Sequence, residues 1–248
     1  MKISFENRTV LVTGGTRGIG RQMVIDYRKA GADVILTGSR PNWSADDEMK
    51  SAGSGRLEYL SADLTLKSEV GALIESIEKM GTIDVCVNNA GINRLNPIES
   101  TSMIDWEEMI RLNLEVPFRI LRSVLPVMKR RSYGRVVNIS SIFGHISREK
   151  RSIYTVTKSG LHGMTVTSAI ECARHNVLIN TVSPGFVLTD LTRKNLSPAE
   201  MADLAGKVPA GRLAEPEEIS RVVLFLTSDL NSYIVGQNIF VDGGYVVT

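Results

Sequence analysis

Seven short apolar segments recur along the chain, separated by longer stretches in which apolar positions follow a helical spacing. The short segments are rich in β-branched residues and almost continuously apolar, which is typical of strands buried on both faces of a parallel sheet. These segments are Thr9–Thr13, Asp33–Thr37, Leu57–Ser61, Ile83–Asn88, Arg135–Ser140, Leu178–Ser183 and Asn238–Asp242.

The stretches between these segments predict helices. Gly31, Gly81 and Gly134 each stand just before a predicted strand, where glycine commonly ends a helix. The alternation of strands and helices predicts one α/β domain over residues 1–248, a doubly wound parallel sheet of about seven strands flanked by helices. The predicted helices are Gly18–Ala30, Lys67–Met80, Asp105–Arg130, Ser152–His175 and Glu217–Thr227.

The stretch Gly185–Arg212 departs from this alternation. It is the least regular part of the chain, contains Pro198 and Pro209, and is too long for a routine connection between a strand and a helix. Such a segment is either a poorly ordered insertion or a lid. We expect residues 185–212 to cover a substrate.

Composition and charge exclude several classes of protein. The 248 residues carry 29 Lys and Arg against 27 Asp and Glu, a net charge of +2 that predicts no nucleic-acid partner. No apolar run approaches the ~18 residues of a membrane helix, and the charged N-terminus does not read as a signal peptide. We therefore expect a cytoplasmic protein. Cys86 and Cys172 predict a buried reduced pair, and the three scattered histidines predict no metal site.

A glycine-rich loop, Thr13-Gly14-Gly15-Thr16-Arg17-Gly18-Ile19-Gly20, follows the first predicted strand and leads into a helix. Glycine permits a tight turn and close approach of the backbone to a phosphate, while the free amides of the helix start bind the anion. Its place at the first strand–helix junction predicts a dinucleotide site. The spacing, Gly-x-x-x-Gly-x-Gly, is one residue longer than the common dinucleotide fingerprint.

At this loop the chain resembles the short-chain dehydrogenase/reductase family, whose members carry Thr-Gly-x-x-x-Gly-x-Gly here. The resemblance continues through Ala62-Asp63-Leu64, Asn88-Asn89-Ala90-Gly91, Leu112-Asn113-Leu114 and Pro184-Gly185 with Thr189. It implies a Rossmann-type fold. It also implies a cofactor site made of Gly14, Thr16, Arg17, Gly18, Ile19, Gly20, Arg40, Asp63, Leu64, Asn89, Ala90, Gly91, Tyr154, Lys158, Pro184, Gly185, Val187 and Thr189.

Tyr154 and Lys158 stand at i and i+4 of a predicted helix, so both side chains lie on one face. A free tyrosine titrates near ~10 and is a poor base at neutral pH, but a nearby ammonium favours its phenolate. Ser141 follows a predicted strand, on the side where open α/β sheets gather their active sites. Alone, each has an ordinary explanation: the Tyr–Lys pair as a surface contact, Ser141 and Asn113 as caps or turn residues.

The order and spacing of these residues match the catalytic residues of the family, which favours the catalytic interpretation. The resemblance implies that Tyr154 exchanges a proton with the substrate oxygen while Ser141 hydrogen-bonds that oxygen. It further implies that Lys158 tunes Tyr154 and binds the nicotinamide ribose, and that Asn113 holds a water that resupplies protons. The hydride comes from the cofactor. A homotetramer, or a homodimer, is also implied.

The end of the second predicted strand bears on the choice of cofactor. Family members that prefer NAD usually carry an acidic residue there, and we expect Gly38 to occupy that place. Arg17 and Arg40 favour the 2′-phosphate of NADP(H), although Arg40 lies one residue later than the usual basic position. The alternative is that both arginines are solvated, which leaves NAD(H) open.

The substrate is left open by the sequence. The charged segment Gly144–Ser152 and Arg94 favour a polar or anionic small molecule, such as a carrier-linked acyl group or a sugar derivative, unless the segment is simply solvated. Lys129-Arg130-Arg131 either contacts an acidic carrier or stabilises a helix end. The leading hypothesis is an NADP(H)-dependent oxidoreductase that interconverts a ketone and a secondary alcohol, such as a 3-oxoacyl thioester. The alternatives are an NAD(H)-dependent sugar or secondary-metabolite dehydrogenase and a non-catalytic nucleotide-binding module.

Overall fold

A computed structural model describes residues 3–248. It contains a seven-stranded sheet in which all neighbouring strands are parallel, in the order β3-β2-β1-β4-β5-β6-β7, and this confirms the predicted fold. The winding reverses between β1 and β4, where an open α/β sheet forms its ligand crevice. The strands are β1 (Thr9–Val12), β2 (Asp33–Gly38), β3 (Leu57–Ser61), β4 (Val85–Asn88), β5 (Gly134–Ile139), β6 (Val177–Pro184) and β7 (Asn238–Val241).

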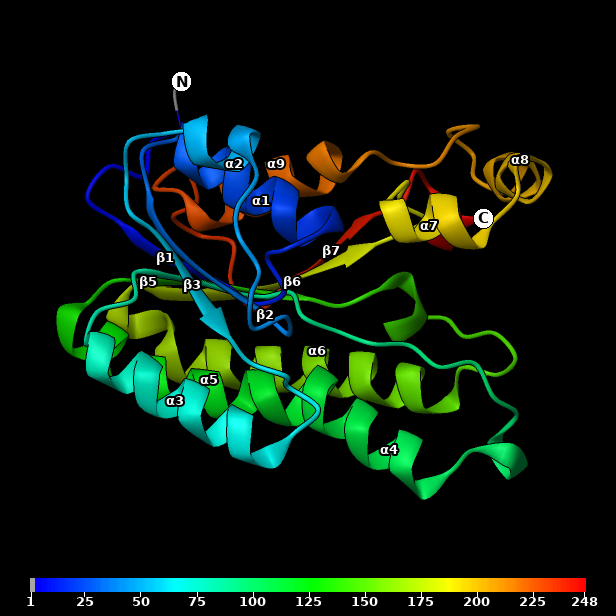
Figure 1. Cartoon of the computed structure of the whole chain (residues 1–248), viewed down its shortest axis with the longest axis horizontal. Coiled ribbons are helices and arrows are strands. Elements are labelled where there is room, and N and C mark those ends of the chain that lie inside the picture. Colours follow the sequence, from blue (N-terminus) through cyan, green and yellow to red (C-terminus); the bar gives the residue numbers. More distant parts are fainter. Residues whose placement is uncertain (1–2) are drawn as a thin grey trace.

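Helices cover both faces of the sheet (Figure 1). One layer holds α1 (Gly18–Lys29) and α9 (Pro216–Thr227), with the short α2 (Asp47–Ser51) beside α1. The opposite layer holds α3 (Lys67–Met80), α5 (Val116–Arg131) and α6 (Ser152–Cys172).

The two layers explain the continuous apolar runs. In β1, Val10 and Val12 belong to the hydrophobic cluster under α1 and α9, whereas Leu11 belongs to the cluster under α3, α5 and α6. Successive side chains of a strand point to opposite faces, so a sheet covered on both sides needs apolar residues at every position. The edge strands β3 and β7 are only partly buried.

The structure corrects two details of the predicted helices. The helix expected over 105–130 is divided into α4 (Met103–Ile110) and α5 by a π-helical turn over Arg111–Glu115. The stretch expected to be irregular contains α7 (Asp190–Asn195) and α8 (Pro198–Gly206). A hydroxyl side chain caps each of these two helices, and such caps begin a helix even where the apolar pattern is weak.

Within residues 3–248, no helix combines the length and the apolar character that crossing a membrane requires. Both cysteines are buried and carry free thiols.

Candidate active site

A cavity of about 460 Å³ lies at the crevice between β1 and β4. It contains most of the residues predicted to bind a cofactor, contributed by the loops after β1, β2, β3 and β4 and by the segment before α7. Those residues are Gly14, Thr16, Arg17, Gly18, Ile19, Gly20, Arg40, Asp63, Leu64, Asn89, Ala90, Gly91 and Thr189.

The glycine-rich loop forms one wall of this cavity. Gly14 and Gly18 have φ angles of +66° and +53°, a left-handed conformation that side chains disfavour. A Cβ on Gly20 would stand 2.1 Å from the Gly14 carbonyl oxygen. Arg17 precedes α1 without a side-chain cap, so the N–H groups of the first turn remain for an anion. The loop therefore fits a pyrophosphate.

Hydrogen bonds tie this loop to the neighbouring strands. The Gly14 N–H donates to Thr37 Oγ1 over 3.1 Å. Asn89 Nδ2 donates to the carbonyl oxygens of Thr13 and Gly14 at 2.9 and 3.1 Å. Thr13 Oγ1 accepts the N–H groups of Asn89 and Ala90. The backbone is thereby held in place across β1, β2 and β4.

At Gly38, the last residue of β2, a larger side chain would crowd the Thr16 side chain. A Cβ on Gly38 would stand 2.5 Å from the Thr16 methyl carbon. The Tyr59 hydroxyl fixes the turn by donating to the carbonyl oxygens of Gly38 and Arg40, at 2.9 and 2.6 Å. Arg17 and Arg40 are exposed at the cavity, and no acidic side chain within residues 3–248 forms an ion pair with either. This arrangement suits an additional phosphate.

The first two turns of α6 carry Tyr154 and Lys158. The Lys158 ammonium nitrogen lies 5.7 Å from the centroid of the Tyr154 ring and donates to the Ile139 carbonyl oxygen at 2.8 Å. Burial lowers the pKa of Lys158 to about 8. Burial also raises the pKa of Tyr154, an effect that the Ser141 hydroxyl and the Arg151 guanidinium partly offset. Ser141, Tyr154 and Lys158 are thus brought together as predicted.

Gly91 joins the cavity to these catalytic candidates. It lines the cavity, and a Cβ on it would stand 3.5 Å from Lys158 Nζ and 3.4 Å from Asn113 Oδ1. The lysine ammonium therefore lies at one end of the cavity. A dinucleotide with its pyrophosphate at α1 would extend toward this end.

Asn113 lies within the π-helical turn and is buried. Its Nδ2 donates to the Ile92 carbonyl oxygen at 2.9 Å and to Thr157 Oγ1 at 3.2 Å, while its Oδ1 accepts the Ile92 N–H at 2.9 Å. π-turns commonly occur at functional sites. This one joins α4 and α5 to the segment after β4 and to α6.

Five predicted cofactor residues lie outside the residues that line the cavity: Tyr154 and Lys158, described above, and Pro184, Gly185 and Val187. The Val187 side chain is 8% exposed and packs in the hydrophobic core. A Cβ on Gly185 would stand 2.8 Å from the Asp242 Cα, so this glycine permits close packing of the chain after β6 against the end of β7.

A row of aromatic rings and one arginine border the catalytic residues. The Phe143 and Phe186 ring centroids are 6.3 Å apart, and those of Phe186 and Tyr245 are 5.1 Å apart. The Arg151 guanidinium lies 4.3 Å from the Phe143 centroid. Arg94, by contrast, is bound by Asp105 and Glu108. The sequence pointed to neither Phe186 nor Tyr245, because they come from distant segments.

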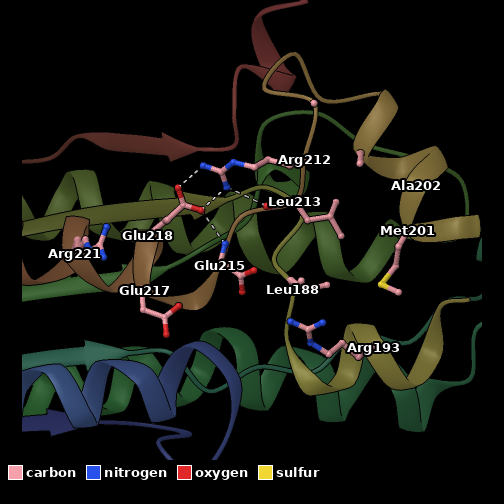
Figure 2. Close-up of a pocket in the computed structure, with 12 residues that line it drawn as sticks. Leu188, Arg193, Met201, Ala202, Arg212, Leu213, Glu215, Glu217, Glu218 and Arg221 are labelled. Carbon is pink, nitrogen blue, oxygen red and sulfur yellow. Dashed lines mark hydrogen bonds and ion pairs between the residues drawn. The ribbon is translucent and has the colours of Figure 1, made fainter. Parts of the chain in front are cut away.

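A second cavity, of about 760 Å³, lies between α8 and the beginning of α9 (Figure 2). Arg212 and Glu218 face each other there and form two short contacts, at 2.6 and 2.7 Å. Leu188, Met201 and Leu213 supply apolar lining. None of the predicted site residues lines this cavity.

Known proteins are similar to this chain over almost its whole length. The family model described as enoyl-(acyl carrier protein) reductase, a short-chain dehydrogenase model, matches residues 14–246. The chain belongs to the short-chain dehydrogenase/reductase family. This short-chain dehydrogenase/reductase is 38% identical to the 3-oxoacyl-[acyl-carrier-protein] reductase FabG of Aquifex aeolicus over 247 residues, covering 98% of this chain and 99% of the relative.

Solved structures of other proteins also resemble this chain over nearly its whole length. A 3-oxoacyl (acyl-carrier-protein) reductase from Agrobacterium tumefaciens, with NADP bound, superposes with a TM-score of 0.91 at 33% identity, covering 98% of this chain and 95% of that one. A candidate NAD(P)-dependent gluconate 5-dehydrogenase from Beutenbergia cavernae, with NADP bound at low occupancy, gives 0.89 at 32% identity and 99% coverage of both chains. This short-chain dehydrogenase/reductase is an oxidoreductase by family.

Proposed function

We propose that this enzyme uses NADP(H) to interconvert a ketone and a secondary alcohol by hydride transfer. The observation that carries the proposal is the position of Gly91. This glycine lines the cavity, and because it has no side chain, only a short gap lies between the cavity wall and the side chains of Lys158 and Asn113. We infer that the cavity and the Ser141–Tyr154–Lys158 cluster belong to one site, with Gly91 at their boundary. A cofactor-binding module without turnover would not need Tyr154 and Lys158 there.

NADP(H) is the cofactor that this cavity favours. The N-terminus of α1 would hold the pyrophosphate, Asp63 and Leu64 would lie beside the adenine, and Arg17 and Arg40 would pair with the 2′-phosphate. The crowding at Gly38 disfavours the carboxylate through which NAD-preferring members bind the ribose. The NADP bound to the two structural relatives supports the same choice. When bound, the nicotinamide supplies or accepts the hydride.

The protein's own residues manage the proton. During reduction Tyr154 donates its phenolic proton to the carbonyl oxygen, and Ser141 hydrogen-bonds that oxygen as charge develops on it. Lys158 beside Tyr154 stabilises the phenolate that remains. Asn113 fixes Ile92 and Thr157 at this end of the site, and its role in holding a relay water stays a prediction.

We propose compounds with a 3-oxoacyl group as the substrates, with 3-oxoacyl thioesters as the leading candidates. The names of the Aquifex and Agrobacterium relatives support this class. We further propose that residues 185–212, which include α7 and α8, cover the substrate. The cavity behind α8 would give that segment room to move. Arg131 pairs with buried Asp84, which favours a structural role for this member of the basic cluster at the end of α5.

We also propose a cytoplasmic homotetramer. Phe118 on α5 and Ile170 on α6 are 54% and 76% exposed, and apolar side chains on these long helices would be covered by a second copy. The free, buried state of both cysteines accords with a reducing compartment. Sedimentation of the purified enzyme tests the assembly, and a stable monomer would contradict it.

A direct assay tests the proposed activity. NADPH oxidation is followed in the presence of 3-oxoacyl thioesters, simple ketones and sugar-derived ketones, with wild type and Tyr154→Phe compared side by side. We expect turnover of 3-oxoacyl compounds by the wild type only. Equal rates for both proteins would refute the catalytic assignment, and a clear preference for NADH would refute the cofactor assignment.

A further inference from the structure

Arg151 is the most unusual charge near the catalytic residues. It occupies the position just before α6, three residues before Tyr154, makes no side-chain capping bond there, and is only partly exposed. Its guanidinium lies 4.3 Å from the centroid of the Phe143 ring, so the aromatic ring shields one face from water. Phe143 itself follows Ser141 by two residues and is buried. Arg151 therefore borders the place where the substrate carbonyl would meet Ser141 and Tyr154.

No acidic side chain within residues 3–248 lies at ion-pair distance from Arg151. Burial lowers the pKa of Arg151, nearby Tyr154 raises it, and the positive charge of neighbouring Arg148 lowers it. Partial burial without an acidic partner weakens the hydration of the Arg151 guanidinium, and a ligand that supplies the opposite charge would offset that cost. Arg94, the other arginine considered for the substrate, is already neutralised by Asp105 and Glu108.

We propose that Arg151 binds a substrate carboxylate, so that the enzyme reduces free 3-oxo acids in addition to thioesters. The planar fork of a guanidinium matches the two oxygens of a carboxylate. In a 3-oxo acid one methylene separates the carboxylate from the reacting carbonyl. Arg151 and Tyr154, one helical turn apart, would bind these two groups at the same time. The inference rests on the proposed function, because it assigns a second substrate group to the same site.

The aromatic rings favour the same orientation. Phe143, Phe186 and Tyr245 form a continuous edge-to-face row leading away from Ser141. An alkyl chain lying along these rings would leave the carboxylate toward Arg151, the charged end of the site. A 3-oxo acid has this distribution of groups, with its chain and its carboxylate on opposite sides of the ketone.

The test compares charged and neutral substrates of equal carbon skeleton. Reduction of 3-oxohexanoate and of methyl 3-oxohexanoate by NADPH is measured near pH 7 for wild type, Arg151→Gln, Arg151→Lys and Arg148→Gln. Arg148 is an exposed arginine of the same loop and serves as the matched control. We expect Arg151→Gln to raise KM for the acid about 10- to 100-fold, the usual worth of a charged hydrogen bond, and to change KM for the ester less than about threefold. Arg151→Lys should recover part of the loss, and Arg148→Gln should match the wild type.

Equal losses on acid and ester would overturn the carboxylate assignment, as would a wild type that reduces the ester or the thioester but not the acid. A wild type that reduces no 3-oxo compound would instead refute the proposed function. A second measurement needs no variant: hexanoate should compete with the ketone substrate in the wild type, and hexanamide should not. Competition by both to the same extent would also overturn the inference.

Discussion

The two ends of the sheet both carry charged residues, but they differ in how these charges are partnered: a buried ion pair lies at the end where β4 begins, whereas several positive groups at the other end have no acidic partner among residues 3–248. Before β4, Asp84 is 3% exposed, accepts the Thr9 N–H at 2.9 Å and pairs with Arg131 at 2.7 Å. Nearby, the guanidinium of Arg8 lies 3.8 Å from the centroid of the Tyr133 ring. These contacts tie together segments that begin separate strands.

At the opposite end, where the strands finish, Arg94 is paired with Asp105 and Glu108, but several other positive groups lack acidic partners among residues 3–248. Arg17, Arg40 and Arg151 form no ion pair there, and buried Lys158 donates to a backbone carbonyl instead. The difference teaches how to separate structural from functional charges. A charge paired inside the protein stabilises the fold, whereas a charge left unpaired beside a cavity is a candidate for binding a ligand.

The largest expected effect is at the unpaired end. Tyr154→Phe removes the proposed proton donor and should lower kcat for reduction about 10²- to 10⁴-fold, the usual contribution of a general acid. NADPH affinity, measured by fluorescence titration, and the melting temperature should stay near the wild-type values. A variant with near-normal turnover would remove Tyr154 from the mechanism.

A substitution at the end of the sheet where β4 begins should lower the stability of the protein rather than its activity. Asp84→Ala removes a buried carboxylate that pairs with the partly exposed Arg131 and leaves the Thr9 N–H without its acceptor, so the free energy of unfolding should fall by about 1–3 kcal/mol. Urea denaturation measures this loss, and activity per folded molecule should be unchanged. Asp203→Ala, which removes an exposed pair with Lys207, is the control and should cost at most about 1 kcal/mol. Similar losses for both variants would contradict the comparison.

Arg40→Ala should weaken the binding of NADPH without affecting the binding of NADH. The loss of one charged contact to the 2′-phosphate should raise KM for NADPH about tenfold. Arg56→Ala, which removes an exposed arginine paired with Glu58, is the matched control. An unchanged ratio of the two cofactors' kcat/KM values would show that Arg40 is merely solvated.

The smallest effect is a pH dependence that arises from burial at the unpaired end. Lys158 has a pKa of about 8, below the ~10.4 of a free lysine, so it is mostly charged at pH 7 and half charged near pH 8. An uncharged Lys158 no longer stabilises the phenolate that remains after Tyr154 gives up its proton. For reduction, kcat/KM should therefore be level at lower pH and fall as the pH rises through about 8. Tyr133 at the paired end, with its pKa raised by burial to about 12, does not titrate in this range. Lys158→Arg should move the fall to higher pH, and an unmoved profile would assign it to another group.

The sequence predicted the strands and the catalytic cluster because each leaves a local trace. Continuous apolar runs record burial on both faces, and Tyr154 and Lys158 sit at a helical spacing. The π turn at Arg111–Glu115 was not predicted, since α4 before it is too short for the shift in the phase of the apolar pattern to be recognised in the sequence. The low pKa of Lys158 depends on burial, which only the assembled fold provides.

Long-range contacts account for what the sequence missed at the site. Phe186 and Tyr245 meet although they are distant in the chain, and Phe143 joins them from a third segment. Val187 was predicted at the cofactor by resemblance, but its side chain turns into the core while Thr189 lies at the cavity. A family motif therefore identifies the segment more securely than each of its side chains.

Because of the π turn, the position of Asn113 depends on the number of residues between α4 and α5. A π turn accommodates one more residue than the α-helical turn it replaces, and α4 and α5 lie on either side of it. Loss of one residue there would let the two helices continue as one, but it would rotate either Asn113 or α4 by about 100° around the helix axis. Asn113 would then part from Ile92 and Thr157, or α4 from its present neighbours. A deletion of one codon, with every remaining amino acid unchanged, would thus disconnect the site while leaving a well-formed helix.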